Sequence, residues 1–213
     1  MAMPALVLVH GGAHAADCWD LTIDDWVDSV VADIENAGLR DIVIVGHSMA
    51  GLTVPGVIAK LGAAGVREMI LAAACVPSEG AALADVVSRP VAVIARRNAK
   101  KGGPYELGHV IPRFAMHNGV PRARRRLMAG RLYPESSQIP VEKVSRRDMP
   151  EEVPRTWILT LRDRTHPAKE QRESIEAIGG VQTIIPIDTC HGLMVSEPER
   201  LAEILVERCR ARS

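Results

Sequence analysis

The chain has 213 residues, enough for one domain with a full hydrophobic core and short for two. Its 26 basic and 26 acidic residues cancel, so the molecule as a whole has no electrostatic attraction to nucleic acid or to an anionic membrane. No apolar run approaches the ~20 residues that span a bilayer, and the first ten residues do not have the pattern of a secretion signal. The four cysteines are scattered, without CxxC spacing. We therefore expect a reduced, cytoplasmic protein with neither nucleic-acid nor membrane partners.

Apolar runs and helix-period segments alternate along most of the chain, which predicts a mostly parallel α/β sheet flanked by helices. Thr22 is the predicted N-cap of the first helix, and Ser196 and Glu199 form a predicted capping box for the last one. The predicted strands cover residues 5–9, 41–45, 69–75, 156–161 and 181–187; the predicted helices follow Thr22 and Ser48, cover 167–178 and run from Ser196 to about Arg210.

The middle of the chain, residues 77–154, interrupts this alternation. It is rich in Pro, Gly and Arg and contains no clean strand pattern. We interpret it as a cap inserted between the third and fourth strands of a single domain spanning 1–213. Ligands bind at the carboxyl edge of open α/β sheets, so the cap is expected to cover that edge. Its basic run at Arg122 and 124–126 is interpreted as a solvated helix face rather than as a site for acidic substrates.

The strongest local motif is the run Val43–Leu52, in which an apolar strand leads into a tight turn with Ser48 at its tip. The spacing Gly46-His47-Ser48-Met49-Ala50-Gly51 matches a nucleophile elbow, Gly-x-Ser-x-Gly, with Ala50 in place of the second glycine. Such a turn needs small neighbours because strand and helix pass close together. We therefore predict that Ser48 is a nucleophile.

A serine nucleophile needs a base and an acid that orients the base. His191 is the predicted base, because it follows the fifth strand and so lies at the same sheet edge as Ser48. Asp163, just beyond the fourth strand, is the predicted acid, with Asp188 and Glu79 as weaker alternatives.

A glycine-bearing loop, His10-Gly11-Gly12-Ala13-His14, follows the first strand. Glycines there let backbone N–H groups face a ligand, and a second N–H lies just after the nucleophile. The predicted oxyanion hole is thus formed by Gly12 and Met49, each donor being worth roughly 3 kcal/mol in the transition state.

Together these pieces resemble the α/β-hydrolase superfamily, and more narrowly the small esterases and hydroxynitrile lyases related to plant methyl-ester hydrolases. The resemblance extends over nearly the whole chain, with the cap matching loosely. The matching segments are 7–14 with Cys18-Trp19, 46–51, Val76-Pro77 with Gly80, 157–163, and 190–194 with Pro198.

The resemblance implies a serine-dependent hydrolase of a small-molecule carboxylic ester, with no cofactor. The lyase members carry a Thr in the first loop and a Lys directly after the catalytic His, where this chain has Gly11 and Gly192. That difference favours ester cleavage over cyanohydrin cleavage. The alternatives are a hydroxynitrile-lyase-like or other carbon–carbon lyase on the same fold and a non-catalytic protein that binds a small ligand.

The chain also differs from the members of the resembled family in its predicted sheet. Relatives carry a helix and a parallel strand between the region of Trp19 and the helix that begins near Thr22, whereas here Trp19-Asp20-Leu21-Thr22 runs straight on. The strand at 5–9 should therefore form an uncovered sheet edge. We expect either a second copy of the chain or a rearranged segment 21–23 to cover it.

For the substrate pocket we take His14, Trp19, Phe114, Met116 and Leu193 as candidates, although core packing is an equally good interpretation of the last three. The remaining histidines lack the paired spacing of a metal site, so no metal is expected.

Overall fold

The computed structural model describes residues 3–12, 22–105, 115–122, 124–125 and 133–213. Five parallel strands form one sheet in the order β1-β2-β3-β6-β7. Their bounds are Leu6–Val9, Ile42–His47, Val66–Ala72, Arg155–Thr160 and Thr183–Ile187. The predicted mostly parallel sheet is confirmed, and every predicted strand is present with its ends shifted by a few residues.

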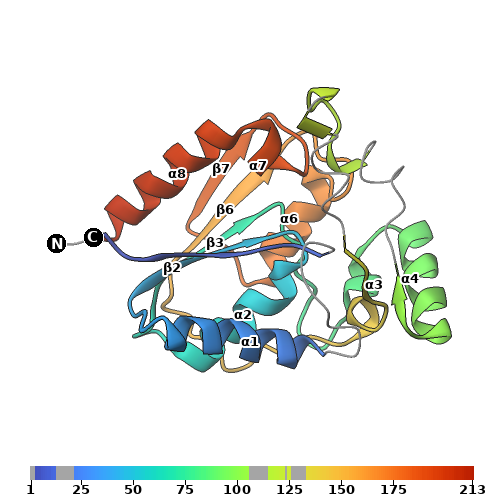
Figure 1. Cartoon of the computed structure of the whole chain (residues 1–213), viewed down its shortest axis with the longest axis horizontal. Helices are drawn as coiled ribbons and strands as arrows, with labels where there is room; N and C mark the ends of the chain where they lie inside the picture. Colours follow the sequence, from blue (N-terminus) through green and yellow to red (C-terminus); the bar gives the residue numbers. More distant parts are fainter. Residues whose placement is uncertain (1–2, 13–21, 106–114, 123, 126–132) are drawn as a thin grey trace.

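Helices cover both faces of the sheet (Figure 1). Alternate residues of β2 point to opposite sides: Ile42 and Ile44 pack into one core cluster, and Val43 and Val45 pack into the other. The first cluster includes buried side chains of α1 (Ile23–Asn36), α2 (Ala50–Leu61) and α6 (Ala168–Ala177). The second is closed by α7 (Leu193–Ser196) and α8 (Pro198–Ala211). A sheet buried on both faces explains why its central strands are apolar without alternation.

Of the two helix N-caps predicted from the sequence, one is confirmed and the other is wrong. Thr22 is the N-cap of α1, as predicted, and the structure adds a complete capping box with Asp25. The capping box predicted at Ser196 is wrong, because the Ser196 hydroxyl contacts Thr189 and the carbonyl of Gly192 instead. The last helical segment is consequently divided, and Pro198 occupies the first turn of α8, where its missing N–H costs no hydrogen bond.

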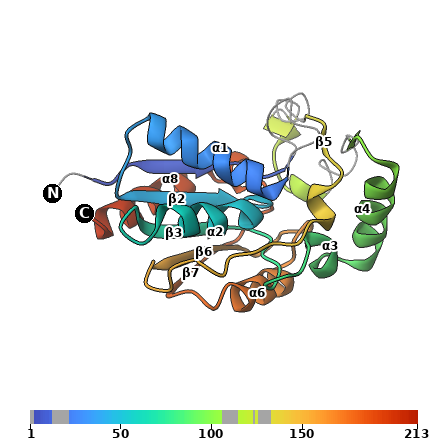
Figure 2. The same cartoon turned by 90° about the horizontal axis from the view of Figure 1, so that it is seen from below.

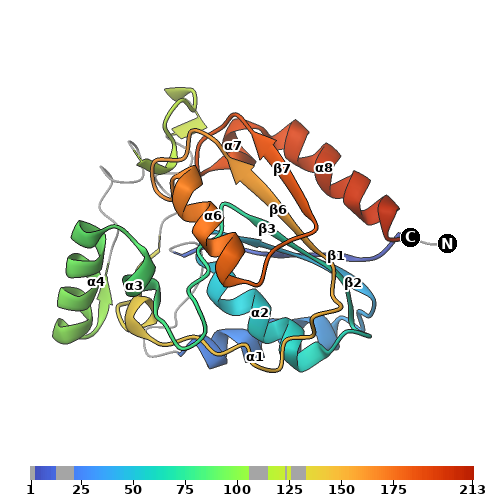
Figure 3. The ribbon, with the colours of Figure 1, turned by 180° about the vertical axis from the view of Figure 1, so that it is seen from behind.

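Residues 77–154 carry short elements at one end of the molecule, opposite the two chain termini (Figures 2 and 3). The described elements include the helices α3 (Leu83–Val86) and α4 (Arg89–Lys101) and the 3-10 turn η2 (Ile139–Val141). The expectation of no strand is wrong in a small way, since β4 (Pro104–Tyr105) and β5 (Glu135–Ser136) form a two-residue antiparallel pair. That this segment functions as a cap stays a prediction.

Within the described residues, β1 pairs with β2 and with no other strand. Val7 and Val9 pack against the first core cluster. Leu6 and Leu8 point to the other face, where they are 39% and 66% exposed. The sheet therefore ends in an edge strand with two uncovered leucines; Leu21, part of the segment considered as an alternative cover, lies outside the described residues.

Candidate active site

Ser48 lies in the sharp turn between β2 and α2 and has a left-handed backbone, with φ of 56°. This conformation is strained for a residue with a side chain. Backbone hydrogen bonds hold it: Ser48 N donates to Ala72 O over 3.2 Å, and Cys75 N donates to Ser48 O over 3.0 Å. A Cβ on Gly51 would lie 2.4 Å from Cys75 O. The glycine at position 51 is thus required by a close approach of two backbone segments.

The structure brings Ser48, His191 and Asp163 together, although they are far apart in the sequence. The Nε2 atom of His191 lies 2.8 Å from Ser48 Oγ, and its Nδ1 atom lies 2.7 Å from Asp163 Oδ2. The three residues come shortly after the ends of β2, β6 and β7. The carboxyl ends of these strands lie at one edge of the parallel sheet. These contacts form one continuous line of hydrogen bonds.

Chemistry fixes the direction of protons along this line. Burial, the largest influence, raises the pKa of Asp163, but hydrogen bonds from His191 and from two backbone N–H groups outweigh it and lower the pKa overall. Asp163 is therefore ionised near neutral pH and can only accept. The His191 Nδ1 atom must then carry a hydrogen, which leaves the Nε2 lone pair to accept the Ser48 hydroxyl proton.

His47 supports this arrangement from beside the nucleophile. Its Nε2 donates to the backbone carbonyl of His191 over 2.9 Å, and the two rings lie 4.8 Å apart between centroids. This hydrogen bond ties His47 to the loop that carries His191.

The loop after β1 passes directly over Ser48. A Cβ on Gly11 would lie 2.7 Å from Ser48 Cβ, and one on Gly12 would lie 2.5 Å from the Met49 sulfur and 2.6 Å from a carboxylate oxygen of Glu135. A side chain is therefore excluded at Gly11, whereas at Gly12 it would have to displace the ends of the Met49 and Glu135 side chains. Gly12 and Met49 both line the same cavity as Ser48, so the predicted oxyanion residues lie close to the predicted nucleophile.

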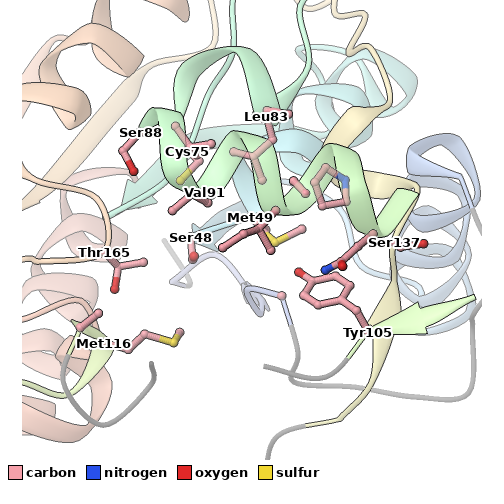
Figure 4. A pocket seen from close by; sticks show the side chains of 18 of the residues that line it. Ser48, Met49, Cys75, Leu83, Ser88, Val91, Tyr105, Met116, Ser137 and Thr165 are labelled. Carbon is pink, nitrogen blue, oxygen red and sulfur yellow. The ribbon is translucent and has the colours of Figure 1, made fainter. Parts of the chain in front are cut away.

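A cavity of about 280 Å³ opens above Ser48. Figure 4 shows Leu83 and Val91 on one side of Ser48 and Met49, and Tyr105 and Met116 on the other. Most of the lining is apolar; it also includes Val87, Ile94, Ala95 and Pro140, with Asn98, Ser137, Arg164 and Thr165 as polar members. The site can thus receive a small, largely apolar molecule with a few polar contacts.

Other predicted residues have different places. Met116 lines the cavity, whereas Leu193 is fully buried in the second core cluster and does not, so the pocket role predicted for Leu193 is wrong. Asp188 forms an ion pair with Arg162, and Glu79 accepts a hydrogen bond from Arg146 N. Neither alternative acid reaches His191. The predicted pocket residues His14, Trp19 and Phe114 lie outside the described residues.

A buried polar cluster behind Asp163 was not predicted from the sequence. Thr160 and Gln171 are each 0% exposed and joined by hydrogen bonds, and His166, 1% exposed, donates its backbone N–H to Asp163 Oδ1. Polar residues at the end of an apolar strand and on the buried face of a helix were the available signal. The partners of such residues depend on the packing of α6 against β6, which a local pattern does not contain.

Within the described part of the chain, no group of three or more His, Cys, Asp or Glu side chains could hold a metal ion. Nor is any described helix long and apolar enough to cross a membrane. The Cys75 thiol lines the cavity, but burial raises its pKa to about 12. A thiol that stays protonated at neutral pH is a poor nucleophile, so Ser48 has no competitor from that residue.

Comparison with known proteins assigns the family. The model of the alpha/beta hydrolase family matches residues 20–204, and the chain belongs to that family. Among curated proteins, none matches the chain significantly.

Solved structures share the fold at low sequence identity. An extracellular alpha/beta-hydrolase from a Paenibacillus species, described as homologous in structure and function to tobacco salicylic acid binding protein 2, is 18% identical with a TM-score of 0.84; the match covers 96% of this chain and 98% of that one. A methylesterase from Arabidopsis is 19% identical with a TM-score of 0.73, over 96% and 98% of the two chains. Polyneuridine aldehyde esterase is 17% identical with a TM-score of 0.69, over 97% and 99%.

The buried His166 generates a prediction about pH and stability. Burial lowers the pKa of its imidazole from 6.5 to about 4, so its contact with Glu170, 3.4 Å away, is not an ion pair at neutral pH. The unfolded chain takes up a proton near pH 6.5 that the folded protein refuses until about pH 4. The contribution of the neutral imidazole to stability is therefore complete above pH 6.5 and is lost as the pH falls from 6.5 to about 4.

We expect His166→Gln to remove this loss. Between pH 7 and pH 4.5, the free energy of unfolding of the wild type should fall by about 2 kcal/mol more than that of the variant. Urea unfolding at both pH values measures the difference. Equal losses in the two proteins would contradict the assignment of a neutral, buried imidazole.

Proposed function

We propose that the chain is a serine esterase that cleaves a small-molecule carboxylic ester through an acyl-enzyme. The observation that carries the proposal is the hydrogen-bonded line Ser48–His191–Asp163, in which a strained serine faces an apolar cavity. Ser48 Oγ attacks the ester carbonyl while His191 Nε2 takes its proton. Asp163 holds the imidazole and stabilises its charged form.

The Gly12 and Met49 N–H groups are proposed to receive the developing oxyanion. Met49 is the N-cap residue of α2, so its N–H belongs to the positive end of a helix dipole. The protonated His191 then gives its proton to the departing alcohol, and water releases the acyl group from Ser48 in the reverse sequence. No step of this mechanism needs a cofactor or a metal.

Packing around two glycines supports ester cleavage over cyanohydrin cleavage. A Cβ on Gly192 would lie 2.7 Å from Cδ2 of His117, and one on Gly11 would collide with Ser48. The Thr and Lys that mark the related lyases therefore have no room in this chain. The substrate is proposed to be small and mostly apolar, because the cavity is about 280 Å³ and has an apolar wall.

A serine-directed fluorophosphonate probe tests the assignment. Mass spectrometry should find the adduct on Ser48, and Ser48→Ala should lose labelling together with at least about 10⁴-fold of ester turnover. Ser78→Ala, a change at an exposed serine outside the cavity, is the matched control and should label like the wild type.

A panel of p-nitrophenyl esters with varied acyl length completes the test. Labelling that survives Ser48→Ala would reject the nucleophile. Aldehyde release from a cyanohydrin without ester hydrolysis would select a lyase, and thermal stabilisation by panel compounds without turnover would select a binding protein.

The proposal extends to a second copy of the chain as the partner of β1. Leu6 and Leu8 pair in register with Val43 and Val45, so they continue the apolar face that closes the second core cluster. Segment 3–9 carries no charge, and charged residues are the usual protection of an exposed edge. Antiparallel pairing of two β1 strands about a twofold axis would satisfy both edges and bury the four leucines together.

We expect the wild type to sediment as a dimer and Leu8→Lys to sediment as a monomer, because a lysine cannot be buried against its symmetry mate. Ile184→Lys is the matched control: Ile184 is 42% exposed on β7, the opposite outer strand, and this change should leave the dimer intact. Sedimentation velocity measures all three. A monomeric wild type, or a dimeric Leu8→Lys, would contradict the pairing.

A cytoplasmic location is part of the same proposal. Cys75, Cys190 and Cys209 are free and buried, as expected of a protein kept in a reducing compartment. Recovery of the native protein from an extracellular fraction would contradict it.

A further inference from the structure

Thr160, at the end of β6, contacts the carboxylate of Asp163. The Thr160 side chain is completely buried, and its Oγ1 lies 3.0 Å from Asp163 Oδ2. That oxygen also accepts the hydrogen bond from Nδ1 of His191, over 2.7 Å. The other carboxylate oxygen accepts from the backbone N–H groups of Thr165 and His166, each over 2.8 Å. The carboxylate thus has four neighbours, and Thr160 is the one that shares an oxygen with the base.

Gln171, on α6, fixes what the Thr160 hydroxyl can do. The Gln171 side chain is also completely buried. Its Oε1 lies 3.3 Å from the indole nitrogen of Trp157 and 3.2 Å from Thr160 N. Both of these groups can only donate, so the oxygen of the amide must face them and the orientation of the amide is determined by chemistry.

The Nε2 atom of Gln171 then faces three acceptors: Thr160 Oγ1 at 2.9 Å, the carbonyl oxygen of His166 at 2.8 Å and the carbonyl oxygen of Thr160 at 3.1 Å. An amide nitrogen has no acceptor capacity, so the Thr160 hydroxyl can only accept from it and cannot donate to it. A hydroxyl carries a single hydrogen. With its acceptor side occupied by Gln171, that hydrogen is directed to Asp163 Oδ2. The chain of donors therefore runs in one direction, from Trp157 through Gln171 and Thr160 to Asp163.

We propose that Thr160, oriented by Gln171, is a positioning residue for the base of this site. It holds Oδ2 of Asp163 in the plane that faces His191 and takes up part of the carboxylate's negative charge. The inference rests on the proposed function, because it assigns a role toward the base of that reaction. Neither residue lines the cavity, so neither touches substrate.

The loop between β6 and α6 explains why such a device is needed. Arg162, Arg164 and Thr165, on either side of Asp163, are exposed, and an exposed loop by itself would hold a carboxylate loosely. Gln171 binds the loop at the His166 carbonyl and binds the strand end at Thr160. The acid is therefore fixed by a rigid strand and a rigid helix rather than by its own loop.

The shape-matched change Thr160→Val tests the proposal, with Thr160→Ser as the conservative variant that keeps the hydroxyl. We expect Thr160→Val to lower kcat by about 10- to 100-fold, the range for losing a hydrogen bond to a charged group. KM should change little because the cavity is untouched. Thr160→Ser should recover most of the activity.

The pH profile separates positioning from a merely structural effect. Without the Thr160 donor, more of the negative charge on Asp163 acts on His191, which favours the protonated imidazole that cannot accept the Ser48 proton. The acid limb of kcat/KM should therefore move to higher pH in Thr160→Val and return in Thr160→Ser. The low-field proton resonance of the Asp163–His191 hydrogen bond, observed by NMR, should shift in the same variant without any substrate.

Each outcome decides one question. If the wild type is not labelled by the fluorophosphonate at Ser48, the proposed function fails. If the wild type is labelled but Thr160→Val keeps its rate, or loses rate with an unmoved acid limb, the positioning role is overturned and the esterase stands. Should Thr160→Val fail to fold, Thr160→Cys replaces it, since a thiol is a weak donor of similar size, and the same shift is expected at smaller amplitude.

Discussion

The left-handed backbone of Ser48 is maintained by the strand beside it, and the geometry of the site depends on that support. β3 and the segment after it contribute both an acceptor, Ala72 O, and a donor, Cys75 N, to the peptide groups around Ser48. Gly51 lets the Cys75 carbonyl approach closely enough to complete this clamp. A strained residue persists only where its surroundings over-determine it, and here the surroundings are the central, fully buried strands of the sheet. The hydroxyl is presented to His191 because the core cannot relax the turn without breaking those contacts.

The second requirement is a buried polar network whose members are satisfied. Asp163 and His191 have side chains with no exposed surface, and burying such groups is costly unless each finds partners of the right kind. A parallel sheet supplies these partners because the carboxyl ends of its strands lie at one edge, which brings the loops after β2, β6 and β7 into contact. Gln171 and Thr160 extend the network into the layer between β6 and α6. The proton positions that the proposed reaction needs follow from this connectivity.

How far the sequence predicts this molecule can be judged at particular residues. The strands, the cap of α1 at Thr22 and the turn at Ser48 depend on neighbours within a few positions, and local patterns identified them. The capping box at Ser196 failed because its hydroxyl is used by Thr189, a tertiary contact with no local signal. Leu193 was misassigned for a related reason: an apolar residue beside the His191 loop can face either the cavity or the core, and only the packing of α7 on the sheet decides which.

By itself the sequence determined the class of fold, the order of its elements and the residues that could supply a nucleophile, a base and an acid. These features follow from periodicity, turn chemistry and residue type, which act over short distances along the chain. Tertiary structure alone decided that His191 bridges Ser48 and Asp163 rather than pairing with Asp188. It also decided that His47 serves the His191 loop and that Gln171 directs the hydroxyl of Thr160. Residues far apart in sequence form a hydrogen bond only when the donor and acceptor atoms come within about 2.7–3.2 Å of each other. The packing of helices on the sheet sets those distances.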